Sequence, residues 1–518
     1  MGWNYVGALT RIVATFVSQL VLARLLGPEV FGRFGYAFLT VSVLALVVDM
    51  GLQSALVQVD KLDAQVLSTA CGRLLAAGAA AAIGVFLLAD QIAALVFEAP
   101  QVAPVLRAMA PTLLVGALNA AAAATLTREL EFRTLQLSAI ASYVIGYMVV
   151  GIGCAVAGFG VWSLVLAWHT QTVLSCIILV ARSGYSLAPS NPLRRLPVDR
   201  YATTVMTSHV ATWVIDNGPH AAVGRWMGAA TLGQFSVAYN LVRVPADQLV
   251  RNVQSVLHSL ASRAQNNNAG LRRAYLTVTC GIALIAFPLF GFVAWMAEPV
   301  VRVLLGSPWA NAATVLTPLS LVMAMHAVEA MAGPTLGGRG EPGVELRVKL
   351  VMLLVAIPVL LVCSRWSLAA VGWGLALVVL VRWLWMNWAV TSRLSIDLSE
   401  FLRTMGGPLI LAAVAVGVPA LISARLAAGA TPPMPGWLLV ACAVPTFVVI
   451  LALTAALPRL VLGPYVLSLL SGLFEKRPGW ARNAALRRIA SSAARAHGEA
   501  RWAHQGASTR GTTLSKVR

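Results

Sequence analysis

Charged side chains are scarce in this sequence. Asp, Glu, Lys and Arg together make up 11% of its 518 residues, whereas a soluble globular domain contains about 25%. The mean hydropathy is correspondingly high, at +0.80. This composition excludes an ordinary soluble enzyme or binding module. In place of the charges stand apolar runs of roughly 20 residues, each long enough to cross the ~30 Å hydrocarbon core of a bilayer.

Cysteines and nucleotide-binding loops are also poorly represented. The six cysteines lie in or beside apolar segments without paired spacing, so we interpret them as small packing residues rather than disulfides or metal ligands. The Walker pattern GxxxxGK[ST] does not occur, which excludes that type of ATP site. Residues 338–343 match GxGxxG, but no strand precedes them, so we predict a short turn there. We expect neither a cofactor nor a bound metal.

The positive charges that are present report topology. Lys and Arg number 38 against 19 Asp and Glu, an excess that could indicate nucleic-acid binding. We place about 14 transmembrane helices at 5–26, 35–57, 74–96, 104–126, 135–157, 161–181, 202–223, 235–258, 275–297, 310–333, 345–363, 368–390, 406–428 and 437–457. With the N-terminus inside, sixteen Lys and Arg fall in cytoplasmic loops and seven on the opposite side. The positive-inside rule then places both termini in the cytoplasm, and we expect no nucleic-acid partner.

A 34-residue stretch occurs twice, at residues 23–56 and 224–257. At a constant offset of 201, 11 of the 34 aligned residues are identical, where roughly three would agree by chance. Each copy contains one arginine and two glycines that we assign to a structural turn motif: Arg24, Gly27 and Gly32, and Arg225, Gly228 and Gly233. We expect each copy to turn through a glycine-containing loop between two hydrophobic segments. Self-similarity at a fixed period indicates a duplicated architecture.

The duplication organises the predicted domains. Each half supplies six spans, an even number, so the halves form a parallel repeat with a site expected between them. We predict an N-terminal six-helix lobe at 1–181, a cytoplasmic linker at 182–201, a C-terminal six-helix lobe at 202–390, appended helices 13 and 14 at 391–470 and a basic cytoplasmic tail at 471–518. The tail contains 10 Lys and Arg against 2 Asp and Glu. We expect it to form a short helix near 480–496 and to lie near anionic lipid headgroups, with a tail that only fixes topology and has no specific partner as the alternative.

The most informative residues are polar ones inside the predicted spans. In the span 235–258 five of them recur at intervals of 4, 4, 4 and 3 and therefore share one helical face: Tyr239, Arg243, Asp247, Arg251 and Gln254. Asp247 lies four residues from each arginine and can pair with both, so the stripe is net positive. An arginine at the membrane centre costs about 2.5–3.5 kcal/mol on insertion scales. We interpret the stripe as the lining of a hydrated cavity, with a structural ion-pair ladder as the alternative.

Three other spans contain similar polar faces. Their members are His209, Thr212, Asp216 and His220 in the span 202–223, Arg11, Thr15 and Ser18 in the span 5–26, and Ser42, Asp49 and Gln53 in the span 35–57. We interpret the first of these faces as a water-facing wall and include the others in the cavity. Asp216 and His220 have no third ligand at a suitable spacing, so no metal site is predicted there.

Two further charges stand alone in the second half. For Glu329, a hydrogen bond between helices and a place in the cavity remain equal alternatives. Arg382 stands among Trp383, Trp385 and Trp388 near the predicted cytoplasmic end of its span. We expect it to snorkel to the membrane surface within an aromatic belt.

The repeated stretch resembles a known family. ARLLGPEVFGRFGYA, followed by a span that ends DMGLQSALVQ, resembles the polysaccharide transporter branch of the multidrug/oligosaccharidyl-lipid/polysaccharide (MOP) exporter superfamily, and GRWMGAATLGQFSVAYNL is similar to the same family. The resemblance implies two six-helix lobes around a central cavity with rocker-switch alternating access. It implies a flippase for undecaprenyl-pyrophosphate-linked oligosaccharide in the bacterial inner membrane, serving O-antigen, exopolysaccharide or capsule assembly. Fourteen spans also resemble the lipid II flippase, whose extra helix pair contributes a groove for the lipid tail.

The resemblance therefore implies a transporter that performs no covalent chemistry, with a lipid-linked oligosaccharide as its substrate and the polymerase or export machinery as a further partner. Arginine binds phosphate bidentately, so we expect Arg11, Arg243 and Arg251 to attract the pyrophosphate. We expect Arg24 and Arg225 to hold the repeated turns at the periplasmic rim, while Asp49, Asp216 and Asp247 balance the arginine charges.

Three alternatives remain: a lipid II flippase, a cation-coupled drug antiporter of the same superfamily, and a membrane polysaccharide polymerase or ligase. The arginine stripe argues against an antiporter, which needs an acidic or aromatic cavity. The short predicted outer loops leave little room for the catalytic groups of a polymerase or ligase.

Overall fold

A computed structural model describes residues 2–59, 63–184, 188–194, 196, 198–263, 267–427 and 435–476. Within these ranges the chain is built of helices and contains no strand, so the all-α prediction is confirmed. Helices satisfy every backbone polar group within one segment, which is what a chain in lipid requires. The side chain of Arg11 and the tail helix predicted near 480–496 lie outside the described residues.

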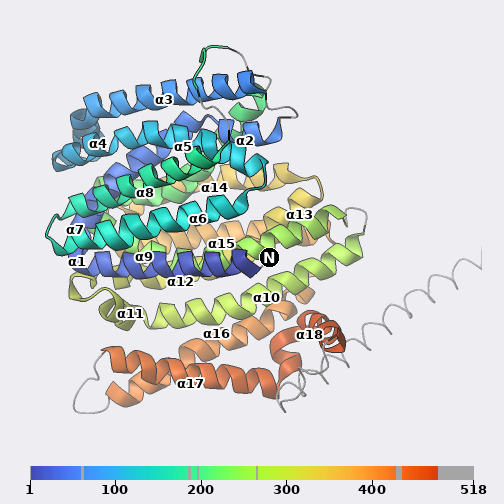
Figure 1. Ribbon diagram of the computed structural model, residues 1–518. Coiled ribbons are helices and arrows are strands. Elements are labelled where there is room, and N and C mark those ends of the chain that lie inside the picture. The colour runs from blue at the N-terminus through green and yellow to red at the C-terminus, as the bar shows by residue number, and fades with distance from the viewer. Residues whose placement is uncertain are drawn as a thin grey trace, which may run out of the picture. The chain divides into compact units, whose positions relative to one another are not determined.

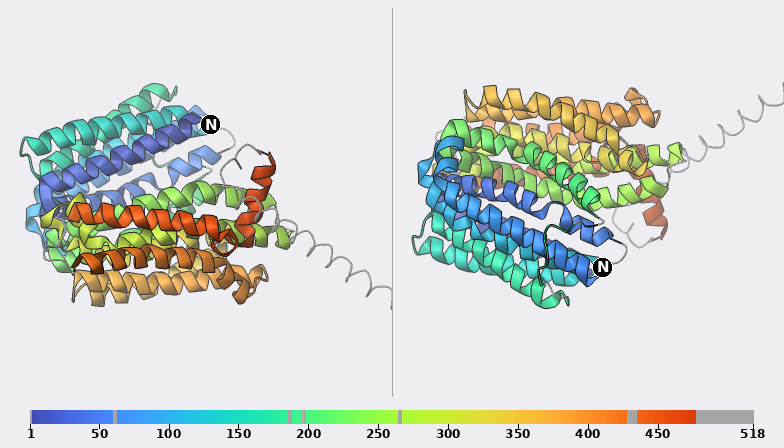
Figure 2. Two further views of the ribbon diagram at one scale, coloured as in Figure 1. Left: turned by 90° about the horizontal axis from the view of Figure 1, so that it is seen from below. Right: turned by 90° about the horizontal axis from the view of Figure 1, so that it is seen from above.

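The chain forms two compact units, and the helices within each unit run alongside one another (Figures 1 and 2). The first unit consists of Met1–Ala238, Leu304–Ala312 and Leu360–Val371, and the second of Tyr239–Val303, Ala313–Val359 and Gly372–Arg518. These units divide inside one continuous helix, whereas the lobe boundary is predicted at the linker 182–201. The division into six-helix lobes therefore stays a prediction.

Short helices and bends interrupt several of the long helices. The elements up to the division are α1 (Gly2–Asp49), α2 (Leu52–Gln58), α3 (Ala64–Gln91), η1 (Ile92–Val96), η2 (Pro100–Val102), α4 (Ala103–Met109), α5 (Pro111–Arg128), α6 (Phe132–Tyr143), η3 (Val144–Gly151), α7 (Ile152–Val156), α8 (Val161–Arg182) and the first part of α9 (Asp199–Arg263). The later elements are α10 (Asn268–Trp295), α11 (Ala297–Leu304), η4 (Ser307–Trp309), α12 (Ala312–Glu329), α13 (Ala332–Gly338), α14 (Pro342–Cys363), α15 (Leu368–Arg393), α16 (Leu398–Ala427), α17 (Pro435–Ala456) and α18 (Pro458–Lys476).

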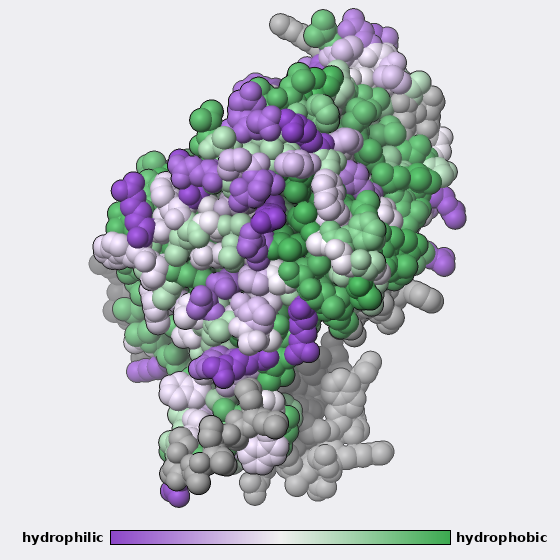
Figure 3. All heavy atoms as spheres, turned by 90° about the vertical axis from the view of Figure 1, so that its left-hand side faces the viewer, coloured by the Kyte–Doolittle hydropathy of each residue, from purple (hydrophilic) through white to green (hydrophobic). Residues whose placement is uncertain are grey.

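Eleven helical runs within the described residues are long and apolar enough to cross a bilayer. One of them, Ala14–Gln58, is bent at Gly27 and covers two predicted spans. α9 covers two more predicted spans but is too polar to be one of the eleven runs. Ten runs match one predicted span each, and the bent run and α9 match two each, which accounts for the fourteen predicted spans. Figure 3, which faces the helix ends at the left of Figure 1, shows hydrophilic side chains beside broad hydrophobic surfaces. The chain is a multi-pass membrane protein.

Small residues set the helix packing in the first unit, where α5 packs against both α3 and α8. Ala117, Ala121 and Ala124 of α5 are buried in one apolar cluster together with Ala70 and Cys71 of α3. Alanine side chains let two helix backbones approach closely, and helix association in lipid depends on such packing. The burial of Cys71 agrees with its predicted role as a small packing residue.

The end of the predicted linker is bound to α3 by hydrogen bonds and an ion pair. The Arg73 side chain donates to the carbonyl oxygen of Pro192 (3.1 Å) and pairs with Asp199 at the start of α9 (2.5 Å). The backbone N–H of Ser190 donates to the carbonyl oxygen of Ser68 (2.9 Å). These contacts fix where α9 begins.

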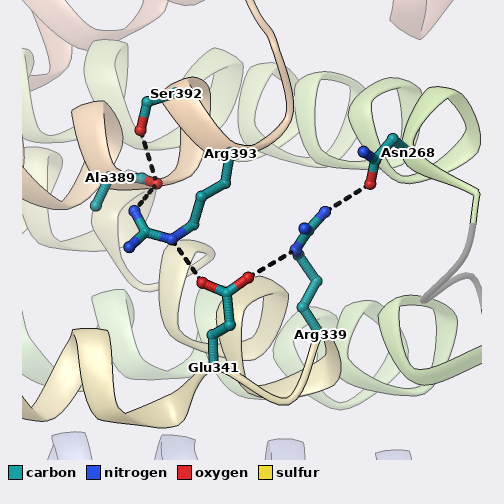
Figure 4. A network of polar contacts seen from close by, with 6 residues as sticks. All are labelled: Asn268, Arg339, Glu341, Ala389, Ser392 and Arg393. Atoms are coloured by element: carbon teal, nitrogen blue, oxygen red, sulfur yellow. Dashed lines mark hydrogen bonds and ion pairs between the residues drawn. The ribbon is translucent and has the colours of Figure 1, made fainter.

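Figure 4 shows a polar network at one end of the second unit. Glu341 accepts from Arg393 (2.6 Å) and Arg339 (3.3 Å), and Arg339 also donates to Asn268 (2.6 Å). The network joins the turn between α13 and α14 to the end of α15 and the start of α10. The hydrogen bond from Arg393, followed by that from Arg339, holds the pKa of Glu341 below its usual value. The GxGxxG match is thus a turn between two helices, as predicted.

Candidate functional site

The two copies of the repeated stretch bend their helices in the same way. Gly27 has φ 75° and ψ 173° in α1, and Gly228 has φ 82° and ψ 176° in α9. An L-residue rarely adopts a positive φ, so glycine is needed at both positions. We expected each copy to turn at a glycine between two hydrophobic segments, and the non-helical dihedrals at Gly27 and Gly228 confirm a turn at each position. The connection is shorter than a loop, because one glycine at positive φ is enough to separate the two helices.

The two copies also pack against each other within the first unit. A Cβ on Gly32 would overlap the backbone carbonyl of Ala229, and a Cβ on Gly233 would overlap that of Pro28. Gly233 is the equivalent of Gly32, and Ala229 is the equivalent of Pro28, at the offset of 201. The contact is therefore reciprocal, as expected for two related elements about a local two-fold axis.

Two hydrogen bonds hold equivalent positions of the two copies, one from Tyr36 of the first copy itself and one from Trp309 outside the repeat. The equivalent carbonyl oxygens of Ala23 and Gly224 each accept a bond from an aromatic side chain, Trp309 Nε1 (3.1 Å) and Tyr36 Oη (2.7 Å) respectively. The two motif arginines reach the turns that follow other helices. Arg24 donates to the carbonyl oxygen of Leu304 (2.8 Å), and Arg225 pairs with Glu98. The predicted motif glycines thus bring the two copies into contact, and the predicted motif arginines tie each copy to a further segment of the first unit.

The stripe on the second part of α9 has the pairing expected from its spacing. Asp247 Oδ2 lies 3.5 Å from Arg243 Nε and 3.2 Å from Arg251 Nη2. Arg243 also donates to the Tyr239 hydroxyl (2.5 Å), and Gln254 donates to the carbonyl oxygen of Ala330 (2.8 Å). The Arg251 side chain is 69% exposed, against 24% for Arg243. One carboxylate shared by two guanidiniums leaves a net positive charge that is open to an anion.

The first part of α9 brings several predicted residues toward α1. Trp213 Nε1 donates to Ser42 Oγ (3.1 Å). Asp49 accepts from the backbone N–H of Gln53 (3.2 Å) and interacts electrostatically with His209. These contacts unite residues from two predicted faces within the first unit.

The water-facing wall predicted on this part of α9 is only partly present. His209 and Thr212 are exposed and Asp216 is half-buried, but His220 is buried at 9% exposure. The His220 ring packs edge-on against Phe235 at 4.9 Å. His220 is therefore not part of the water-facing wall. It lies so near the bend at Gly228 that it packs against the repeated motif.

Arg382 does not snorkel, and that expectation is wrong. Its Nε lies 2.8 Å from Glu329 Oε1, and the two side chains are 16% and 10% exposed. The pair joins α12 to α15. A buried charge is costly unless an opposite charge accompanies it. The sequence did offer one indication of this pair, which is that two isolated and opposite charges lie in different predicted spans. The sequence alone did not indicate that α12 and α15 are neighbours.

Known proteins can now be compared with this arrangement. Residues 21–314, more than half of the chain, match the model of a family described as polysaccharide biosynthesis protein. The chain belongs to this family. The resemblance carried by the repeated stretch is thereby confirmed.

Similar members of the polysaccharide biosynthesis family come from several bacteria. The succinoglycan biosynthesis transport protein ExoT of Rhizobium meliloti is 28% identical over 62% of this chain and 65% of its own length, so the match spans just under two thirds of that relative. The teichuronic acid biosynthesis protein TuaB of Bacillus subtilis is 23% identical over 72% of this chain and 77% of its own. The lipopolysaccharide biosynthesis protein WzxC of Escherichia coli is 20% identical over 71% and 75%.

Two solved structures share the fold of this family member. The lipid II flippase MurJ in an inward closed conformation has a TM-score of 0.72 at 13% identity and covers 89% of this chain and 99% of its own. A multidrug resistance MATE family transporter of the MOP superfamily, in an inward-facing conformation, has a TM-score of 0.59 at 14% identity and covers 74% and 95%. The predicted fold of a MOP transporter is therefore confirmed.

Proposed function

We propose that this chain is a flippase that moves undecaprenyl-pyrophosphate-linked oligosaccharide across the bacterial inner membrane by alternating access. Its product serves the assembly of O-antigen, exopolysaccharide or capsule. The observation that supports this most directly is the stripe on α9, where Arg243 and Arg251 share Asp247 in a helix predicted to cross the bilayer. The names of ExoT, TuaB and WzxC, all of them polysaccharide biosynthesis proteins, agree with it.

The stripe suits a pyrophosphate because of its charge and its partial exposure. Both arginines pair with Asp247, but Arg251 is largely exposed and can turn toward a ligand, whereas Arg243 is also held by the Tyr239 hydroxyl. An anion that approaches both guanidiniums competes with Asp247 for them, which allows the ligand to be released again. Flipping requires no bond to be made or broken. The protein lowers the barrier by replacing the water that a charged headgroup would lose in hydrocarbon.

The remaining partners belong to the same proposal. Both termini lie in the cytoplasm, and the basic tail, residues 471–518, lies against anionic headgroups of the inner leaflet, where each Lys or Arg contributes about 1 kcal/mol. The polymerase or export machinery takes the flipped product. Helices α16 and α17, which correspond to the appended pair 13 and 14, accompany the lipid tail.

Reconstitution tests this proposal. Proteoliposomes with a labelled undecaprenyl-pyrophosphate-linked oligosaccharide in one leaflet should lose the label to the other leaflet when the wild-type chain is present. The variant Arg243→Ala/Arg251→Ala should slow this transfer by roughly 100-fold or more, because charge-assisted contacts to an anion contribute about 1.5–3 kcal/mol each. The matched control is Arg302→Ala, which removes another i,i+4 pair, Arg302–Glu298, on the short helix α11. Unchanged transfer by the double variant would contradict the assignment of the stripe.

A drug antiporter is the competing function with the same fold. The stripe on α9 is net positive, with two arginines to one aspartate, and it repels the cationic drugs that such antiporters carry. Transfer of a cationic dye by the reconstituted wild-type chain, with no transfer of the glycolipid, would favour the antiporter.

A further inference from the structure

The first part of α9 exposes a polar surface that neither the repeated motif nor the charged stripe explains. Between residues 203 and 212 every exposed side chain is polar, and together they form what we call the hydroxyl face: Thr203, Thr204, Thr207, Ser208, His209 and Thr212. The apolar side chains of the same segment, Val205, Met206 and Val210, are half-buried. This arrangement is the reverse of a helix that faces lipid.

α14 shows what a lipid-facing helix of this protein looks like. Between Leu350 and Val362 its exposed side chains are all aliphatic or proline, and Leu354 is 70% exposed. Because hydrocarbon offers no hydrogen bonds, a surface in contact with it is apolar. The hydroxyl face therefore meets water or a polar ligand.

The hydroxyl face lies in the predicted span 202–223. α8 and α10, on either side of α9 in the chain, are both long and apolar enough to span, and α9 bends at Gly228, between its two predicted spans. A helix rises about 1.5 Å per residue, which places Thr212 roughly 20 Å beyond Asp199. The face is therefore too long to be explained only as the water-exposed end of a membrane helix.

The chemistry of the face is that of a neutral hydrogen-bond acceptor. Four threonine hydroxyls donate to the carbonyl oxygen four residues earlier, at 2.9 Å for Thr203, 3.0 Å for Thr204, 2.9 Å for Thr207 and 3.0 Å for Thr212. Each hydroxyl proton is thus directed at the backbone, and the oxygen keeps its lone pairs for a donor outside the helix. Residues 201–224 contain no Lys or Arg. A ligand for this surface is uncharged and rich in hydroxyl donors.

Neighbouring groups narrow the ligand further. The bond from Trp213 Nε1 to Ser42 holds the half-buried indole ring beside the face, and an aromatic ring offers an apolar surface to the C–H side of a sugar ring. Asp49, next to His209, adds a carboxylate at the border of the face. A carboxylated sugar would meet that negative charge, whereas a neutral sugar would not.

We infer that the hydroxyl face of α9 binds neutral sugar residues of the transported lipid-linked oligosaccharide. Sugar hydroxyls donate to Thr207 and Thr212, and one sugar ring packs on Trp213. This inference rests on the proposed function. It assigns recognition of the glycan to the first part of α9.

Equilibrium binding to the full-length chain in lipid nanodiscs tests the inference. The probes are undecaprenyl pyrophosphate, the same lipid with a neutral trihexose, and the same lipid with a uronic acid in place of one hexose. The variant Thr207→Val/Thr212→Val removes two hydroxyls and keeps the side-chain shape. It should bind the trihexose lipid roughly 10- to 100-fold more weakly, since each lost hydrogen bond is worth about 0.5–1.5 kcal/mol. Its affinity for the sugar-free lipid should stay within about 3-fold.

Two control variants separate recognition from damage to the helix. Thr277→Val/Thr454→Val removes hydroxyls that make the same bond to a carbonyl four residues earlier on α10 and α17, and it should change neither affinity. Thr207→Ser/Thr212→Ser restores the hydroxyls and should restore binding of the trihexose lipid. The wild-type chain should prefer the trihexose lipid to the uronic-acid lipid.

The outcomes distinguish the inference from the proposed function. Three results would overturn the inference while leaving a flippase in place. They are an equal loss of affinity for the trihexose lipid and the sugar-free lipid in the valine variant, no loss of affinity for either of them, and no recovery of trihexose-lipid binding in the serine variant. A wild-type chain that binds none of the three lipids would overturn the proposed function and the inference with it.

Discussion

The two copies of the repeated stretch share a backbone and differ in their charges. Both α1 and α9 bend at one glycine, and both present a second glycine to the backbone of the other copy. Apart from Arg24 and Arg225, the charged residues have no such symmetry. The positions of Arg243, Asp247 and Arg251 are occupied in the first copy, at the offset of 201, by Ser42, Leu46 and Met50.

This difference separates what the fold needs from what the ligand needs. At this crossing a Cβ on either side would overlap the backbone of the other copy, so both copies have glycine there. A charge in a membrane is costly wherever it stands, so it is retained only where something compensates for it. We therefore expect changes to the glycines to affect folding and changes to the charges to affect transport.

The largest effect is expected at the crossing itself. Gly32→Ala and Gly233→Ala each place a Cβ into backbone of the other copy, which can be relieved only by separating the helices. We expect each to lower stability by roughly 3 kcal/mol or more, measured as thermal unfolding of the purified protein in detergent. Gly84→Ala is the control, because nothing lies within 4 Å of its added Cβ. A melting temperature for Gly32→Ala equal to that of the wild type would contradict the reciprocal packing.

Making the second copy resemble the first tests the charged stripe. The triple variant Arg243→Ser/Asp247→Leu/Arg251→Met removes both charges and their partner together. Replacing a whole ion-pair group by neutral residues is often neutral for stability, so we expect a change within about 1 kcal/mol. Glycolipid transfer in proteoliposomes should nevertheless fall by roughly 100-fold or more.

The single variant Asp247→Asn completes this test. It leaves two arginines without their carboxylate and should be less stable than the triple variant, by about 1–3 kcal/mol. If the triple variant were the less stable of the two, the stripe would be a structural ladder rather than a binding surface.

A smaller effect is expected from a hydrogen bond that joins the two copies to each other. Tyr36→Phe removes a buried bond of 2.7 Å to the carbonyl oxygen of Gly224 and leaves the ring in place. We expect a loss of about 0.5–1.5 kcal/mol, again measured by thermal unfolding. Tyr201→Phe, on an exposed side chain, should change little. Equal melting temperatures for the two variants would mean that the Tyr36 bond adds nothing to the motif.

The smallest effect is expected outside both copies, at Glu341. The arginine contacts lower its pKa below the ordinary 4.5, so its contribution to stability is present above that value and is lost as pH falls through the lowered pKa. The melting temperature of the wild type should exceed that of Glu341→Gln at pH 6, and the gap should narrow as the pH falls below about 4.5. A gap that widens on acidification would contradict this direction.

Much of the fold could be predicted because a membrane helix depends on the length and hydropathy of one continuous stretch of sequence. Length and hydropathy indicate the spans, and an internal repeat indicates the duplication. Spacing also predicted that Asp247 lies between Arg243 and Arg251, since residues four apart on a helix are always neighbours. The errors concern contacts between helices. Arg382 finds Glu329 on another helix, and His220 is covered by the packing around the bend.

The sequence by itself determined the helical class, the fourteen spans, the repeated glycine motif and the pairing along α9, because each depends on residues close together in the chain. Only the tertiary structure decided that the two motif copies cross through their glycines, that Arg382 is paired, and that the hydroxyls of α9 are exposed while its apolar side chains are half-buried. These features depend on which helices become neighbours, and that is set by the packing of side chains far apart in the chain.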